Sequence, residues 1–233
     1  MLRTQKLGEA DRIITLLTRH HGRVRAVAKG VRRTTSRFGS RLEPFTHVDL
    51  QLAVGRSLDV VTQAETLAPY GAKIGSDYEK YTAGTVMLET AERLVVEDKE
   101  PAVQQFLLLV GGLRTMAAGE RTPSQVLDSF LLRSMSVAGY APSFDACARC
   151  GLEGPHRSFN PAAGGMLCGT CRMPGSASPA LETVGLLGAL LAGDWEAVER
   201  SDPRHRKEAT TLVAAYLAWH MERGLKSMSH VER

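Results

Sequence analysis

The sequence lacks any run of about 18 apolar residues, the length that a helix needs to cross a bilayer. Its first residues, MLRTQKLGEADR, also lack the apolar core of a secretory signal. We therefore expect a cytoplasmic protein that does not bind membranes. Repeats and low-complexity tracts are absent too, and 43% of the 233 residues are apolar, so a folded core is expected rather than disorder.

Signatures of catalysis are also missing. There is no G-x-S-x-G nucleophile motif, and the seven histidines are scattered along the chain. Gly30 and Gly39 fit neither a phosphate-binding loop nor a dinucleotide fingerprint. The residues therefore give no support to an enzyme, and we expect none.

Acidic residues are absent from one long N-terminal stretch. Nine Lys and Arg occur from Arg12 to Arg41 with no Asp or Glu between them. Residues 1–76 hold 13 Lys and Arg against 6 Asp and Glu, a balance of +7, whereas residues 77–233 hold 16 against 19, a balance of −3. Such local charge is typical of a site for nucleic acid or another polyanion. The alternative is that the cations only solubilise a sheet edge.

The residues that are present in the first 70 positions show the period of two that is typical of strands. We expect about five short strands, at residues 2–6, 13–18, 23–29, 46–54 and 58–64. Strands of this number and length suit a small antiparallel barrel or sandwich, and the OB-fold is the commonest small basic version. The sequence therefore predicts an N-terminal five-stranded OB-fold β-barrel.

The second and third predicted strands form a hairpin around His21-Gly22. In the third strand, alternation turns Val24, Ala26 and Ala28 toward one face. The opposite face then carries Arg23, Arg25, Val27 and Lys29. This face is basic, with a single apolar residue.

The segment from Gly30 to Leu42 has no period and is expected to be a long mobile loop or a short helical turn. Aromatic residues for base stacking are scarce in it. Phe38 could stack on a base, whereas Phe45, beside Pro44, is expected in the core. Contacts to nucleic acid would then be mostly to phosphate, largely independent of sequence and steeply salt-dependent.

After Gly71 the apolar residues recur with a period of 3.6, which predicts helices. We expect helices over 78–95 and 103–119. Three more follow a cap and a proline: one after Thr122-Pro123 with Gln125 completing a capping box, one over 181–191 after Ser178-Pro179, and one over 204–226 after Asp202-Pro203. The whole is an α+β multidomain protein, with a domain at 1–70 for binding a polyanion and a helical domain at 71–233.

Four cysteines interrupt the helical part as two CxxC pairs, Cys147-Ala148-Arg149-Cys150 and, after seventeen residues, Cys168-Gly169-Thr170-Cys171. Two such pairs can complete one tetrahedron, so we predict one zinc ion bound by Cys147, Cys150, Cys168 and Cys171 in a ribbon at about 144–175. Four thiolates close the coordination shell, so the zinc is structural. Redox motifs or free thiols are the alternative, and His156 could replace one cysteine. A zinc deaminase is not supported, because Ala146 rather than a proline precedes the first CxxC pair.

Several runs of the chain resemble the bacterial RecO family of DNA repair proteins. They are LRTQKLGEADRI from Leu2, GRVRAVAKGVRR from Gly22, Ser36-Arg37-Phe38 and Leu42-Glu43-Pro44-Phe45. The two CxxC pairs also agree in position with those members of the family that carry zinc.

The resemblance implies an N-terminal OB-fold followed by a helical domain with a zinc ribbon. It implies a recombination mediator that binds single- and double-stranded DNA, anneals complementary strands and helps RecA to displace single-strand-binding protein. The partners implied are RecR, the acidic tail of single-strand-binding protein and, in some pathways, RecF. No catalytic turnover is implied, and the location would be cytoplasmic, at the nucleoid.

In the family, DNA contacts fall in the hairpin and in the loop after it. The resemblance therefore makes Lys29, Arg32, Arg33, Arg37 and Arg41 the first DNA-binding candidates, and the basic strand face adds Arg23 and Arg25.

Two departures from the family pattern matter. Members usually have several residues before the equivalent of Leu2, so either the start of the chain differs or the first strand is short and the barrel edge less secure. Zinc is not universal among members, so here it would serve folding rather than the shared activity. From the residues alone two other classes stay open: a zinc-ribbon accessory factor of transcription or translation, and an adaptor whose basic face meets an acidic partner tail.

Overall fold

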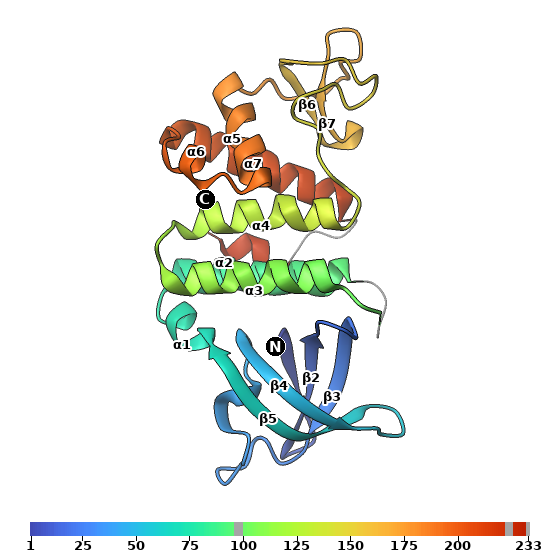
Figure 1. Ribbon diagram of the computed structural model, residues 1–233, viewed down its shortest axis with the longest axis vertical. Helices are drawn as coiled ribbons and strands as arrows, with labels where there is room; N and C mark the ends of the chain where they lie inside the picture. The colour runs from blue at the N-terminus through green and yellow to red at the C-terminus, as the bar shows by residue number, and fades with distance from the viewer. Residues whose placement is uncertain (96–99, 222–225, 232–233) are drawn as a thin grey trace. The chain divides into compact units, whose positions relative to one another are not determined.

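The computed structural model describes residues 1–95, 100–221 and 226–231 of the chain (Figure 1). The chain forms two units, Met1–Glu120 and Arg121–Arg233. The first contains a β-sheet and three helices, and the second contains the remaining helices and a small strand pair.

All five predicted strands are present, and they form one sheet. They are β1 (Arg3–Leu7), β2 (Asp11–Leu17), β3 (Arg23–Ala28), β4 (Thr46–Ala53) and β5 (Asp59–Pro69). The order in the sheet is β1-β2-β3-β5-β4, and every neighbouring pair is antiparallel except β3 and β5, which are parallel. The predicted hairpin of β2 and β3 is confirmed.

Closure of this sheet into a barrel stays a prediction. In the part of the chain that the structure describes, no ladder pairs β1 with β4, the two ends of the strand order. Two backbone hydrogen bonds nevertheless link these edges: Met1 donates to the Thr46 oxygen at 3.0 Å, and Phe45 donates to the Met1 oxygen at 3.3 Å. The OB-fold is itself a partly open barrel, so an incomplete seam is compatible with it.

The alternation predicted for β3 is confirmed. Val24, Ala26 and Ala28 are buried, whereas Arg25 and Lys29 are exposed. The buried side chains join a core contributed by β2, β3, β5 and the segment between β3 and β4: Ile14, Leu16, Val24, Ala26, Ala28, Phe38, Leu42 and Val61. Removal of this apolar surface from water is the main force that holds the sheet together.

The segment between β3 and β4 contains a short helical turn, η1 (Gly39–Leu42), one of the two forms expected for it. Its beginning is fixed to the turn between β1 and β2, because the Asp11 carboxylate accepts a hydrogen bond from the Gly30 N–H at 2.7 Å and Arg32 N donates to the Ala10 oxygen. Gly30 has φ of +64°, a left-handed conformation that glycine adopts without strain.

Three helices complete the first unit: α1 (Tyr70–Gly75), α2 (Tyr78–Leu94) and α3 (Val103–Ala118). Figure 1 shows α2 and α3 running side by side, and they pack against each other. Both were predicted, whereas α1 was not. Ion pairing also joins the sheet to α2, since Arg3 Nε donates to the Glu92 carboxylate at 2.7 Å.

The second unit is helical with one interruption, as predicted. Its elements are α4 (Pro123–Val137), β6 (Ser158–Asn160), η2 (Pro161–Ala163), β7 (Gly165–Leu167), α5 (Leu181–Ala192), α6 (Trp195–Glu199), α7 (Pro203–His220) and η3 (Lys226–His230). Helices α4, α5 and α7 pack against one another, and the antiparallel pair β6–β7 forms the centre of the interruption. The ring of Phe159 in β6 packs against two other rings. Its centroid is 6.4 Å from that of Phe144, which precedes β6, and 6.1 Å from that of Tyr216 in α7.

Three helix ends differ from their predictions. Thr122 does precede α4, but its hydroxyl donates to the Gln125 side chain at 2.6 Å instead of capping the backbone. The predicted helix over 181–191 is confirmed as α5, but its N-cap is Ala180 rather than Ser178. Helix α7 is capped by Asp202 as predicted but ends at His220, and residues 222–225 of the predicted helix lie outside the described part of the chain.

Candidate metal centre and nucleic-acid interface

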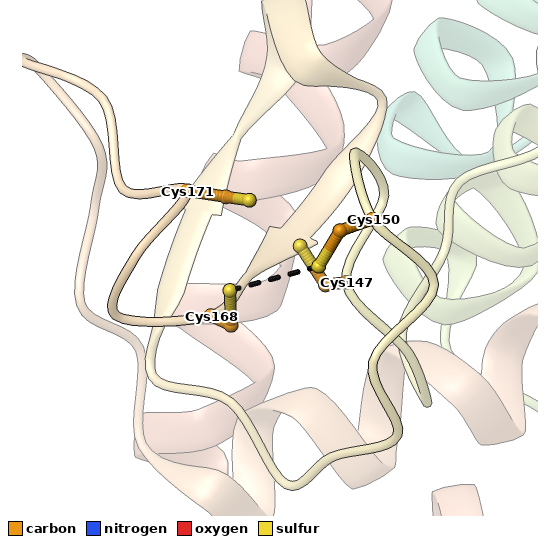
Figure 2. A group of neighbouring side chains, drawn as sticks. All are labelled: Cys147, Cys150, Cys168 and Cys171. Carbon is orange, nitrogen blue, oxygen red and sulfur yellow. Dashed lines mark hydrogen bonds between the residues drawn. The ribbon is translucent and has the colours of Figure 1, made fainter.

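The four cysteines of the two CxxC pairs lie together in the second unit. All four Sγ atoms lie within 4.8 Å of one another, and Figure 2 shows the side chains converging from two loops. The Sγ atoms of Cys150 and Cys168 are 3.8 Å apart. A tetrahedral zinc with sulfur bonds of about 2.3 Å has neighbouring sulfurs about 3.8 Å apart, so the cluster has the size of a metal site. All four cysteines are free, which excludes a disulfide between them.

Backbone hydrogen bonds shape the two loops that carry these thiols. In the first loop Gly151 N–H donates to the Cys147 oxygen at 2.8 Å, and in the second Cys171 N–H donates to the Cys168 oxygen at 3.2 Å. Ala148 N–H donates to the oxygen of Met166 in β7, which joins the first loop to the strand that precedes the second. The β6–β7 pair therefore brings together two loops that are distant in the sequence.

Gly165, at the start of β7, fixes the approach of the chain before the first CxxC pair. Its φ is +142°, and a Cβ atom there would lie 2.2 Å from the Ser143 oxygen. Met166 N–H donates to that same oxygen at 2.8 Å. Only glycine fits this close crossing of two backbone segments.

The electrostatics of the cluster favour a bound cation. Hydrogen bonding, above all from the backbone of Cys168, lowers the pKa of Cys147 to about 6. Hydrogen bonding to the side chain of Cys168, followed by that to Cys150, raises the pKa of Cys171 to about 12. The first thiolate thus forms readily and the last resists, because negative charge accumulates in a small volume. A divalent metal ion would compensate that charge and allow all four thiolates to form.

The donor set therefore suits a tetrahedral metal ion held by sulfur alone, which leaves no open position for a substrate. His156 is not part of the cluster, since its Nε2 lies 2.8 Å from the Leu152 oxygen and the grouped ligands are the four cysteines.

The seven predicted DNA-binding residues lie on β3 and on the segment that follows it, and they differ in what they contact. Arg25, Lys29 and Arg33 are exposed, and among the described residues no hydrogen bond or ion pair engages their side chains. These three cations are therefore available to an outside ligand.

The other four candidates have contacts within the protein. Arg32 donates to the backbone oxygens of Gly8 and Glu9 at 3.3 and 2.8 Å, which fixes the segment to the β1–β2 turn. Arg41 donates to the Arg37 oxygen at 2.7 Å. The Arg37 guanidinium lies over the Phe38 ring, 4.9 Å from its centroid, and Arg23 donates to the backbone oxygen of Glu92 in α2 at 3.3 Å.

Phe38 is not available for base stacking, so this prediction was wrong. Its side chain is only 3% exposed and belongs to the sheet core. Burial of its apolar ring outweighs its position in a polar, basic segment. Phe45 is buried, as expected.

Strand register reveals one further cation, Lys6, that no local pattern indicated. Lys6 of β1 pairs with Arg12 of β2, which in turn pairs with Ala28 of β3. Lys29 directly follows Ala28, so the exposed Lys6 and Lys29 lie at the same end of the sheet. At the far side of the strand order, exposed Asp49 of β4 pairs directly with exposed Glu65 of β5. The sheet is thus basic toward β1–β3 and acidic toward β4–β5.

In the residues that the structure covers, no helix is both long and apolar enough to span a bilayer. The fold and the site together define a class of protein with a basic five-stranded sheet, a helical part and a cluster of four cysteines that could hold a metal ion.

Comparison with known proteins identifies the family within that class. Residues 1–70 match the model described as Recombination protein O N terminal, and residues 75–229 match Recombination protein O C terminal. The chain is 75% identical over 236 residues to DNA repair protein RecO of a Nocardioides species, across all of this chain and 97% of that protein. It is 62% identical over 239 residues to that of Streptomyces griseus and 60% identical over 233 residues to that of Thermobifida fusca, each across all of this chain and 96% of the relative. The chain therefore belongs to the RecO family, and its role lies in DNA repair and recombination.

Proposed function

We propose that this chain is a recombination mediator that binds single- and double-stranded DNA without sequence preference and anneals complementary strands. Together with RecR, it helps to load RecA onto DNA coated by single-strand-binding protein. Residues 1–70 act as the DNA-binding domain and residues 71–233 as the helical domain, with the metal ribbon inside the latter. Family membership supports this activity.

The observation that carries the proposal is the set of three unengaged cations on β3 and the segment after it: Arg25, Lys29 and Arg33. They lie on the basic side of a sheet whose opposite edge is acidic, so a polyanion is attracted to one side only. Arg23, Arg32, Arg37 and Arg41 contribute to the same positive potential while they also hold the protein together.

Contact to phosphate explains annealing without catalytic turnover. Two complementary strands repel each other, and the repulsion acts over about 8 to 10 Å at moderate salt. Cations that bind both backbones lower this repulsion and release counterions. Base pairing then proceeds without any covalent chemistry, so the protein needs no catalytic residue.

The metal is zinc in this proposal, one ion per chain, and its role is structural. Cys147, Cys150, Cys168 and Cys171 would hold it, and it would supply crosslinking of the two loops rather than chemistry on a substrate. The helical domain grips the acidic, apolar-ended tail of single-strand-binding protein, and RecF takes part in some pathways. The protein acts in the cytoplasm, at the nucleoid.

A strand-annealing assay with strands coated by single-strand-binding protein tests this function. The variant Arg25→Ala/Lys29→Ala/Arg33→Ala should anneal far more slowly than the unchanged protein. Its matched control removes three exposed cations elsewhere, Arg114, Arg157 and Lys207, for which no side-chain partner is described. Equal annealing by both variants would refute the assignment of the basic surface, and failure of the unchanged protein to anneal would refute the proposed activity.

A further inference from the structure

Burial of Phe38 raises the question of where the bases of a bound strand would lie. In the described part of the first unit, the strongly exposed aromatic side chains are Tyr78 and Tyr81, which are 60% and 49% exposed. Both lie in the first turns of α2, three residues apart, so they share one face of the helix. Their phenol hydroxyls have no hydrogen-bond partner among the residues that the structure covers.

Tyr81 is supported from within the unit by Phe45. The two rings meet edge to face, with centroids 5.9 Å apart and planes at 68°. Phe45 has φ of +65°, an uncommon conformation for a bulky residue, and such strain persists only where the surroundings fix it. Gly84 of α2 makes room for the ring, since a Cβ there would lie 3.0 Å from its Cε1 atom. Contact with Phe45 thus holds the Tyr81 ring in place while the residue stays 49% exposed.

The segment from Gly30 to Leu42, between β3 and β4 and here called the basic segment, leads directly to Phe45. Phe45 follows the exposed Arg41 by four residues, a reach of at most about 14 Å for extended chain. At about 3.4 Å per nucleotide of a stacked strand, this is the length of about four nucleotides. A strand whose phosphates contact the basic segment can therefore extend its bases to α2.

We propose that Tyr78 and Tyr81 form a stacking surface for the bases of single-stranded DNA whose backbone the basic segment binds. This inference rests on the proposed function. Unpaired bases present free faces to an aromatic ring, whereas the bases of a duplex already stack on one another. The tyrosine pair therefore favours single strands, while the cations of the basic segment bind single and double strands alike.

The charges around the pair permit this ligand. The Asp77 carboxylate accepts a hydrogen bond from the Lys80 N–H at 3.0 Å as the cap of α2. Glu79 is exposed beside the pair, and Lys80 and Lys73 supply two cations nearby in the sequence. These two acids and two lysines balance in charge, so together they do not repel a DNA strand.

The test compares an oligo-dT strand with an abasic strand of the same length, which has the same phosphates and no bases. Tyr78→Ala/Tyr81→Ala should weaken equilibrium binding to oligo-dT by about tenfold or more, from the stacking contribution of about one base or more. Binding to the abasic strand and the salt dependence of both should stay unchanged. Tyr78→Phe/Tyr81→Phe should behave as the unchanged protein, because it keeps both rings. Leu107→Ala, at a 52% exposed position of α3, is the control for loss of apolar surface.

A second measurement does not depend on a substituted protein. An oligonucleotide that contains 5-iododeoxyuridine should crosslink to the unchanged protein at Tyr78 or Tyr81, as mapped by mass spectrometry. The stacking surface would be overturned if Tyr78→Ala/Tyr81→Ala lost equal affinity for both strands, or lost no affinity for oligo-dT. Crosslinks found only at residues other than Tyr78 and Tyr81 would also overturn it. The proposed function would survive all three results, whereas failure of the unchanged protein to bind either strand would overturn the proposed function itself.

Discussion

Removal of the three unengaged cations allows the phosphate contacts to be counted. In Arg25→Ala/Lys29→Ala/Arg33→Ala the sheet should stay folded, because these side chains are exposed and have no described partner. Each phosphate contact contributes about 0.7 to the slope of log affinity against log salt for single strands and about 0.9 for duplexes. The slope should therefore fall by about 2 for single-stranded DNA and by about 2.7 for duplex DNA.

The same contacts set the loss of affinity. For single strands, three such contacts raise the affinity by about 2 logarithmic units when salt falls from 1 M to 0.1 M. Loss of all three contacts should therefore weaken binding to single strands at 0.1 M salt about 100-fold. Fluorescence anisotropy of a labelled oligonucleotide at several salt concentrations measures both quantities. The control without Arg114, Arg157 and Lys207 should keep the original slope. Parallel plots for the triple variant and the unchanged protein would refute the reasoning, as would an equal fall in the control.

Three further predictions concern the metal site and the basic segment. Cys147→Ser should lose about one bound metal ion per chain by elemental analysis, because three thiolates hold a structural ion poorly, and should lose structure in the ribbon alone. Metal affinity of the unchanged protein should rise with pH, because each thiol must lose its proton to bind the metal. Below about pH 6 Cys147 is protonated too, so metal binding displaces one more proton there. Competition with a chelator should therefore show that metal affinity depends more steeply on pH below about 6 than above it. Arg32→Ala should lower the free energy of unfolding in urea by about 1 kcal/mol, through loss of its hydrogen bonds to the Gly8 and Glu9 oxygens.

Each of these predictions has an outcome that contradicts it. Full metal occupancy in Cys147→Ser would show that this thiol is not a ligand. Serine at Cys150, Cys168 or Cys171 should cause the same loss of metal as Cys147→Ser. Metal affinity that does not vary with pH would mean that the thiols are not the donors. For Arg32 the neighbouring Arg33→Ala is the matched control, because Arg33 has no described partner, and equal stability of the two variants would remove the role given to Arg32.

Patterns of neighbouring residues predicted the buried face of β3 and the cysteine cluster, because both depend on residues that are close in sequence. The period of two placed Val24, Ala26 and Ala28 in the core because alternation alone decides which face of a strand is buried. The cysteine spacing predicted the metal cluster because each CxxC turn brings its own two thiols together.

Features that depend on distant contacts could not be predicted in this way. Phe38 lies in a segment without a period, so nothing local indicated that its ring reaches the core formed by β2, β3 and β5. The engagement of Arg32 depends on carbonyl groups in another turn. Helices α1 and α6 span only six and five residues, too few to show a helical period.

The parallel contact between β3 and β5 has a consequence for the order of folding. It consists of only two residue pairs, Ala26 with Asp59 and Val27 with Val60, whereas β4 and β5 pair along nearly their whole length. Contacts between neighbours in sequence form early, and those that close a long loop form late, because the loop loses entropy before the contact is made. The β1-β2-β3 meander and the β4–β5 hairpin should thus form first and join afterwards. The basic segment is the loop that this last step closes, so a strand of DNA bound there would hold together the two halves of the sheet and slow their separation.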